Sequence, residues 1–160
     1  MKKLIYTLLI IIALTNNSFS AGDSNTTAKA SDYTKAKNLI NSAKKYEKKG
    51  KIDKAQERYA KAQKLLLKSN EIKPLQADTL NYLGFTTRKL GDYEKGEKFY
   101  LLGLQVEPNH NGINEYLGEL YVATNRMDMA KERLEVLKTC NCEEYEELKE
   151  IIDGSKKSKY

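Results

Sequence analysis

Residues 80–100 read LNYLGFTTRKLGDYEKGEKFY, and residues 114–134 read NEYLGELYVATNRMDMAKERL. Each segment carries an apolar helical pattern, a short polar break and a second amphipathic helical pattern. The tetrapeptide NYLG at 81–84 recurs as EYLG at 115–118, and Pro108 closes the first copy before the second begins. The two copies are shifted by 34 residues. A repeat with this period predicts two helical hairpins that follow one another along the chain.

The two copies resemble the tetratricopeptide repeat (TPR) family, in which a helix–turn–helix unit of about 34 residues is repeated. The matching residues are Leu83, Gly84, Tyr100 and Pro108 in the first copy and Leu117, Gly118, Tyr121, Ala130 and Leu134 in the second. A further copy upstream places Leu39, Ala43, Tyr46, Gly50, Ala55, Tyr59 and Ala62 at corresponding offsets. Its junction with the next copy is seven residues too long, about two helical turns, so we expect its second helix to continue through Leu65–Leu67.

We therefore expect an all-α solenoid of about three TPR-like helical hairpins with a C-terminal capping helix, because one hairpin cannot bury its apolar stripe alone. The expected helices are roughly 32–49, 53–69, 76–90, 93–106, 111–124 and 127–139. A seventh is expected from near Cys142 to near Asp153, with Asn141 as its N-cap. Small residues at the packing offsets, Gly96 and Gly103 among them, indicate close contacts between helices.

The N-terminus has the features of a secretory signal peptide. Lys2 and Lys3 form a positive region, Leu4–Leu14 is an apolar run too short to span a membrane, and small residues precede a cleavage site after Ser20. The expected organisation is a signal peptide at 1–20, a flexible leader at 21–31, the repeat domain at 32–153 and a basic disordered tail at 154–160. This organisation predicts an exported protein, most simply a periplasmic one.

The formal net charge of +6 is unevenly distributed. Residues 21–74 hold 14 basic and 6 acidic side chains, whereas residues 75–153 hold 9 basic and 16 acidic ones. The chain is therefore bipolar rather than uniformly basic, and an exported protein rarely meets nucleic acid, so we expect no nucleic-acid partner. Binding of a membrane surface or an anionic polymer by the basic segment is an alternative, and it predicts loss of binding at moderate salt.

Catalytic motifs are missing from the sequence. His110 is the only histidine and lies in a Pro-Asn-His-Asn-Gly turn, where we expect it to be exposed to solvent. The sequence contains no Gly-rich phosphate loop and no His-Glu-x-x-His motif. We therefore expect a protein that is not an enzyme and that uses no cofactor or metal.

Cys140 and Cys142 are the only cysteines. An oxidising compartment favours a disulfide between them, which would pin the turn before the last helix. Free or redox-active thiols, an intermolecular bridge, and soft-metal binding with Met127 or Met129 stay open as alternatives. They support a second hypothesis, a periplasmic thiol-redox or soft-metal-handling protein. The ending CNCEEYEEL at 140–148 is similar to the ends of some small exported bacterial TPR proteins.

The resemblance to TPR proteins also implies where a partner binds, because the first helix of each hairpin lines a concave groove in that family. The groove residues implied here are Lys37, Ile40, Lys44, Lys48, Asp78, Asn81, Phe85, Arg88, Glu115, Glu119 and Val122. Such a groove would grade from basic to acidic, with Phe85 near its middle. The expected function is that of a scaffold or adaptor that binds a protein or an extended peptide of unknown identity.

Overall fold

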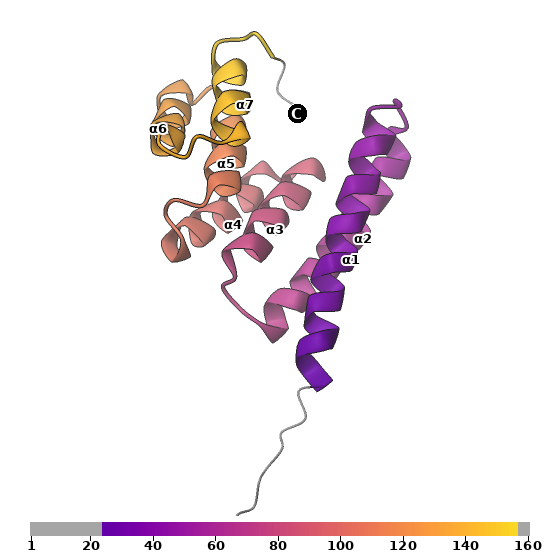
Figure 1. The fold of residues 1–160 in the computed structure, drawn as a ribbon. Helices are drawn as coiled ribbons and strands as arrows, with labels where there is room; N and C mark the ends of the chain where they lie inside the picture. The colour runs from indigo at the N-terminus through magenta and orange to yellow at the C-terminus, as the bar shows by residue number, and fades with distance from the viewer. Residues whose placement is uncertain (1–23, 157–160) are drawn as a thin grey trace, which may run out of the picture.

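The computed structural model describes residues 24–156, with side chains from residue 32 onward, and in this part the chain forms seven α-helices and no strand. The helices are α1 (Ser24–Glu47), α2 (Ile52–Ile72), α3 (Ala77–Lys89), α4 (Tyr93–Val106), α5 (Asn111–Ala123), α6 (Met127–Leu137) and α7 (Glu143–Ile152). Three successive pairs form hairpins, α1 with α2, α3 with α4 and α5 with α6, and α7 packs against α5 and α6 (Figure 1). The expected all-α solenoid of hairpins with a capping helix is confirmed.

The hairpins stack in chain order. The first helices contact one another in the series α1, α3 and α5, and α7 continues that series by packing on α5. The second helix of each hairpin also contacts the first helix of the next unit. In Figure 1 the α1–α2 hairpin lies at one end of the stack and α5–α7 at the other. The side of the stack formed by α1, α3 and α5 is called the inner face below.

The α1–α2 hairpin is longer than the other two. Helix α2 continues through Leu65–Leu67 to Ile72, so the two additional turns expected from the long junction are confirmed. Small alanine side chains let α1 and α2 approach closely. Ala36 and Ala43 are fully buried, as is Tyr59 in the same cluster. Helix α1 begins at Ser24, so most of the segment expected to be a flexible leader is helical in the structure. The signal peptide expected at 1–20 lies outside the described residues.

The turns inside the second and third hairpins each contain a residue in the left-handed backbone conformation at the same repeat position. Gly91 has φ 96°, and Asn125, which holds the same position in the next copy, has φ 58°. Glycine and asparagine are the residues that adopt this left-handed conformation most readily, and it ends a helix sharply. Asp92 then caps the N-terminus of α4, because its side chain accepts a hydrogen bond from the Lys95 amide at 3.0 Å. The repeat is therefore visible in backbone geometry as well as in sequence.

The C-terminal end differs from expectation in two details. Asn141 is not the N-cap of α7; it has φ 49°, and Cys142, in an extended conformation, precedes the helix without a side-chain capping bond. Residues 155 and 156, which belong to the segment expected to be a disordered tail, make defined contacts: Lys156 Nζ lies 3.1 Å from Glu147 Oε1, and Ser155 Oγ donates to Asp153. Residues 157–160 lie outside the described part.

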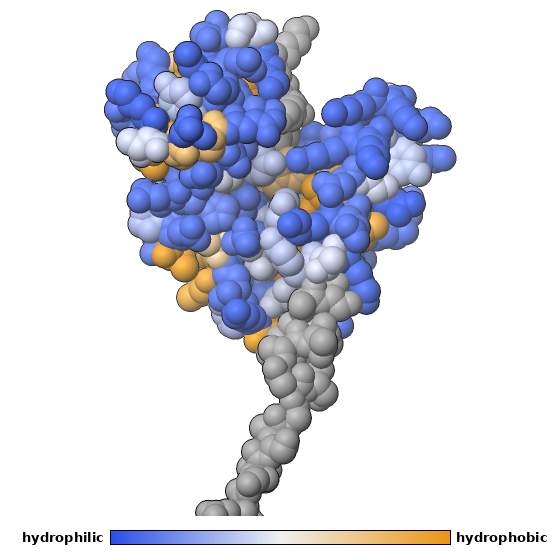
Figure 2. All heavy atoms as spheres, in the orientation of Figure 1, coloured by the Kyte–Doolittle hydropathy of each residue, from blue (hydrophilic) through white to orange (hydrophobic). Residues whose placement is uncertain are grey.

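The face of the stack drawn in Figure 2 is mainly hydrophilic, with a few apolar patches. The side chains of Ile52, Leu75 and Val106 are about half exposed and are among the more exposed large apolar groups of the described chain. None of the helices within residues 24–156 combines the length and the apolar character needed to cross a bilayer.

Small residues set the spacing of the helices around Tyr100. A Cβ added at Gly84 would lie 2.5–2.8 Å from three atoms of the Tyr100 ring, which is fully buried. A Cβ added at Gly103 would lie 2.5 Å from Ile113 Cδ1, the end of a flexible side chain, and 3.4 Å from Leu80 Cβ. Gly103 therefore lies at a close contact rather than on a tolerant surface.

These two glycines should respond differently to alanine. We expect Gly84→Ala to lower the free energy of unfolding by about 1–2 kcal/mol, because overpacking against a fixed ring outweighs the gain in helix propensity. We expect Gly103→Ala to change it by less than about 1 kcal/mol, because Ile113 can rotate away. Chemical denaturation of both variants beside the wild type measures the difference. A Gly84→Ala protein as stable as the wild type would contradict the packing described.

Candidate functional site

Tyrosine rings from successive hairpins meet on the inner face. Tyr33 of α1 and Tyr82 of α3 pack edge to face, with ring centroids 6.0 Å apart. Lys37 Nζ lies 5.5 Å from the centroid of Tyr33 and 5.8 Å from that of Tyr82, so its ammonium is close to both rings. Asp78 lies one helical turn before Tyr82 and is exposed. A cation and a carboxylate thus accompany one half-buried aromatic pair.

Lys44 links α1 to α5 across α3. Its Nζ donates a hydrogen bond to Tyr116 Oη at 3.2 Å and lies 4.6 Å from the centroid of Phe85. Phe85 also packs against Tyr59 and Tyr116, with centroids 5.7 Å and 5.0 Å away, and is only 1% exposed. Burial raises the pKa of the Tyr116 phenol, which stays neutral and able to accept this bond.

A buried ion pair joins the second hairpin to the third. Arg88 Nη2 lies 3.1 Å from Glu119 Oε2, and Arg88 Nη1 donates to the backbone oxygen of Tyr116 at 2.6 Å. Both side chains of the pair are fully buried. Carboxylate oxygens of Glu115, Glu119 and Glu147 all lie within 4.8 Å of one another. Burying these charges costs desolvation free energy, which close pairing of the charges must offset. This pairing holds α3, α5 and α7 in register.

A polar pocket of about 380 Å³ opens where the N-terminal ends of α3 and α5 meet α7. Its lining residues are Asp78, Asn81, Tyr82, Glu107, Asn109, His110, Asn111, Gly112, Glu115, Tyr116 and Glu144. Carboxylates, amides and phenols dominate this set. The arrangement can accept hydrogen bonds, and it offers no nucleophile paired with a base.

His110 has a structural role that the sequence did not indicate. Its side chain is only 13% exposed, so the expectation of a solvent-exposed turn residue was wrong. Nδ1 accepts a hydrogen bond from the Ile113 amide at 3.2 Å and caps α5, and Nε2 lies 3.2 Å from Asp78 Oδ1. An accepting Nδ1 places the hydrogen on Nε2, which therefore donates to Asp78. The ring fastens the start of α5 to the start of α3.

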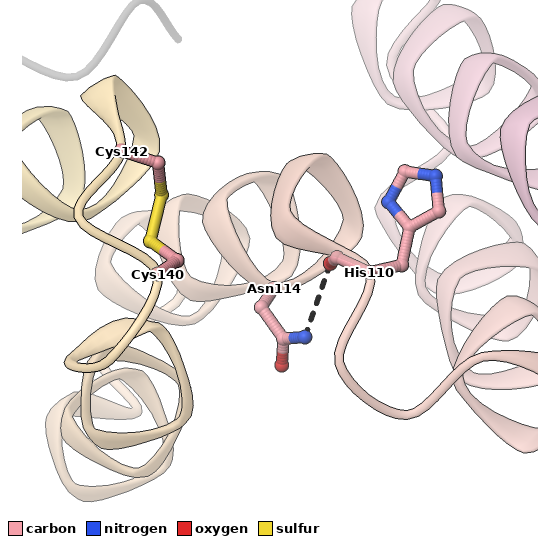
Figure 3. The surroundings of a disulfide bond; sticks show 4 residues. All are labelled: His110, Asn114, Cys140 and Cys142. Atoms are coloured by element: carbon pink, nitrogen blue, oxygen red, sulfur yellow. Dashed lines mark hydrogen bonds between the residues drawn. A yellow bond between two sulfur atoms is a disulfide. The ribbon is translucent and has the colours of Figure 1, made fainter.

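Cys140 and Cys142 form a disulfide, with Cα atoms 5.2 Å apart, at the junction between α6 and α7 (Figure 3). Neither cysteine is a free thiol. In Figure 3 the His110 ring points away from the sulfurs, whereas Asn114 Nδ2 donates to the His110 backbone oxygen at 3.1 Å. In this oxidised state the sulfurs have no thiolate to offer a soft metal, and no imidazole stands beside them to activate one.

The eleven implied groove residues divide by exposure. Lys48 and Asp78 are exposed, Lys37, Lys44 and Val122 are half-buried, and Ile40, Asn81, Phe85, Arg88, Glu115 and Glu119 are buried. Asn81 and Glu115 still line the pocket, whereas Ile40, Phe85, Arg88 and Glu119 are covered by neighbouring helices, so for these four positions the implied exposure was wrong. Phe85 is the clearest case, because Lys44, Tyr59 and Tyr116 surround its ring.

Several inner-face residues were missed from the sequence. Tyr33, Tyr82 and Tyr116 are half-buried and lie at the contacts between hairpins. A signal existed for two of them, because Tyr82 and Tyr116 are the shared tyrosine of the tetrapeptide that occurs in both copies of the repeat. Glu144 gave no such signal, because the packing of α7 alone brings it to the pocket.

No known protein family matches the chain, and no curated protein does. Among solved structures, the Sgt2 TPR domain from Aspergillus fumigatus is similar over 75% of this chain and 78% of that domain, with a TM-score of 0.55 and 18% identity. The first TPR domain of human RPAP3 matches at 23% identity and a TM-score of 0.49, over 79% of this chain and 98% of that one. The first TPR of Spaghetti (RPAP3), bound to an HSP90 peptide, matches at 22% identity and a TM-score of 0.49, over 77% and 94%. The fold is a TPR-like helical-hairpin solenoid.

The buried ion pair should dominate the stability of the inner face. Replacing Arg88 by Met leaves buried carboxylates without their guanidinium, so we expect a loss of about 3–5 kcal/mol in the free energy of unfolding. Arg126→Met is the matched control, because Arg126 pairs with Glu97 at a partly exposed position and should cost about 1 kcal/mol. Urea denaturation of the two variants measures both losses. Equal losses would show that burial does not set the worth of the Arg88 pair.

Proposed function

We propose that this protein is a non-catalytic interaction module that binds a protein or an extended peptide along its inner face. The observation that carries the proposal is the row of half-buried tyrosines Tyr33, Tyr82 and Tyr116, one from each hairpin. Tyrosine supplies a large apolar ring with a polar tip at a small entropic cost, which is why it is frequent at interfaces. A row of such rings across three repeats suits a ligand that is itself extended.

The charges beside the row support selectivity. Lys37 and Lys44 approach the rings from α1, whereas Asp78 and Glu115 come from α3 and α5. A partner whose charges run in the complementary direction would bind in one orientation, because like charges placed opposite one another are unfavourable. The apolar contribution comes from tyrosine rings rather than from Phe85, which is buried.

A charge exchange within the inner face tests the proposal. Lys37→Glu combined with Asp78→Lys keeps the net charge and removes no aromatic ring, yet it reverses the charges around the Tyr33–Tyr82 pair. We expect this variant to retain less than about a fifth of the partner captured by the wild type from the native cell envelope, because charge complementarity is lost. Mass spectrometry of the captured proteins gives the measurement.

The control exchanges a pair on α4. Glu94→Lys with Lys98→Glu inverts an exposed i,i+4 ion pair and also leaves the net charge unchanged. It should capture the partner as the wild type does, and both variants should unfold at the wild-type temperature. Full capture by the inner-face variant would exclude this surface as the binding site.

We also propose that the protein is exported and acts in the periplasm, as do small exported bacterial TPR proteins. The proposal is supported by the basic and apolar N-terminal segment of the sequence. The disulfide between Cys140 and Cys142 adds support, because disulfides persist in oxidising compartments.

Export predicts a shortened chain in the periplasmic fraction. We expect intact-mass spectrometry of protein from that fraction to give a chain that starts at Ala21, with Cys140 and Cys142 blocked to alkylation until a reductant is added. A chain that retains Met1, found with the cytoplasmic proteins and fully alkylated without reductant, would contradict export.

A further inference from the structure

The turn between α1 and α2 carries a run of exposed lysines. Residues 48–54 read KKGKIDK, and every one of them is exposed to solvent. This segment holds four lysines and one aspartate, and it is called the basic tip below. Figure 1 shows that the tip extends beyond the turn between α3 and α4, at the end of the long first hairpin. The basic tip is therefore a convex projection that the other described helices do not cover.

Backbone hydrogen bonds fix the shape of the basic tip. Gly50 has φ 68°, and its amide donates to the backbone oxygen of Glu47 at 2.8 Å. The Lys51 amide donates to the backbone oxygen of Tyr46 at 2.9 Å. Together these two bonds form the Schellman motif, in which a left-handed residue ends a helix and satisfies its last carbonyls. The lysines of the tip thus project from a defined turn.

The neighbouring carboxylate of α1 does not neutralise the tip. Glu47 is already satisfied by other groups, because its Oε1 lies 2.7 Å from Lys89 Nζ and its Oε2 accepts a hydrogen bond from Tyr59 Oη at 2.9 Å. The ion pairs of the described hairpin involve other lysines, and none of the four tip lysines is among them. The tip lysines therefore present their charges to solvent.

The charge balance of this end of the hairpin stays positive when every neighbour is counted. Residues 48–61 hold six basic and two acidic side chains, so their sum is +4. Of the two acids, Glu57 is paired with Lys61, and Arg58 and Lys54 also attract it, which lowers the pKa of its carboxyl. Helix dipoles do not alter the balance, because the negative end of α1 and the positive end of α2 meet at the tip.

An apolar side chain stands among these lysines. Ile52 is 53% exposed, the largest fraction among the large apolar side chains of the described chain. A single exposed isoleucine is common on soluble proteins, so it indicates a partner only together with its surroundings. Here Lys51 precedes it and Lys54 follows two residues later. An apolar group flanked by basic side chains is the combination found in segments that lie in the interface of a membrane.

We propose that the basic tip docks on the surface of an anionic lipid bilayer. A convex projection cannot enclose an extended peptide, whereas a flat anionic surface meets several ammonium groups at once. Each lysine close to such a surface strengthens binding by about fivefold. The long lysine stems keep their charges at the headgroups while Ile52 enters the region below them. The tip contains none of the inner-face tyrosines, so docking leaves the proposed peptide-binding surface free, and this proposal does not rest on that function.

Co-sedimentation of the protein, as purified from cells, with lipid vesicles tests the proposal. The probes are vesicles of phosphatidylcholine alone and vesicles in which about a third of the lipid is phosphatidylglycerol. We expect the anionic vesicles to bind at least about tenfold more tightly. This difference should vanish when NaCl is raised from about 0.05 M to about 0.5 M, because salt screens the charges. Equal binding to both kinds of vesicle at low salt would overturn the proposal.

Two matched variants separate the tip from net charge. Lys49→Gln with Lys51→Gln removes two charges from the tip and should weaken binding to the anionic vesicles by about tenfold or more. Lys64→Gln with Lys73→Gln removes two charges from exposed positions about 18 Å or more along the hairpin from Ile52, and should change it by less than about threefold. All variants share the same N-terminal segment. Equal weakening by the two pairs would overturn the proposal.

A second comparison tests the apolar contact with lipid. Ile52→Ala should weaken binding to the anionic vesicles by about threefold or more, because less apolar surface leaves water. Val106→Ala, at a side chain that is 48% exposed on α4, should bind as the wild type does. If Ile52→Ala binds like the wild type and soluble heparin binds the tip as tightly as the vesicles do, the ligand is a soluble polyanion and the bilayer proposal is wrong.

The inner-face variant distinguishes failure of this proposal from failure of the proposed function. Lys37→Glu with Asp78→Lys should bind the anionic vesicles as the wild type does, because it leaves the basic tip intact. Loss of vesicle binding in this variant at an unchanged unfolding temperature would overturn the assignment to the tip.

Discussion

The buried guanidinium of Arg88 ties the second hairpin to the third, and the shape of the inner face depends on this contact. It donates to the backbone oxygen of Tyr116, pairs with Glu119, and lies 5.9 Å from the ring centroids of both Tyr100 and Tyr116. A hydrogen bond to backbone leaves little freedom to slide one helix past the other. The polar pocket between α3 and α5 keeps its form because these two helices cannot shift independently.

The same packing divides the charges of the inner face into two kinds. Charges such as those of Arg88 and Glu119 are fully buried and stabilise the stack, whereas Lys37 and Asp78 keep contact with solvent and can meet a ligand. Buried pairs are held by desolvated contacts, so they respond little to salt, while exposed charges act through a screened field. The charges that stabilise the stack are thus different from those that stay exposed on the same face.

Much of the fold could be predicted from the sequence, but less of the site could. The repeat period, the helix breakers near Gly91 and Pro108, and the additional residues at the first junction placed the helices to within a few residues of their ends, except at the start of α1. For the site, helical periodicity named positions on one face of each helix. It could not tell which of them, Phe85 for example, a neighbouring helix would cover.

The sequence by itself determined the all-helical repeat and its turns, because these depend on local periodicity and on residues such as Gly91 and Asn125 that end helices wherever they occur. Only the tertiary structure decided which side chains stay exposed on the inner face. Whether a side chain is exposed depends on which helices pack against it. The Lys44 side chain lies over the ring of Phe85, and the packing of the capping helix brings Glu144 to the pocket. Such contacts join residues far apart in the chain, and no local pattern encodes them.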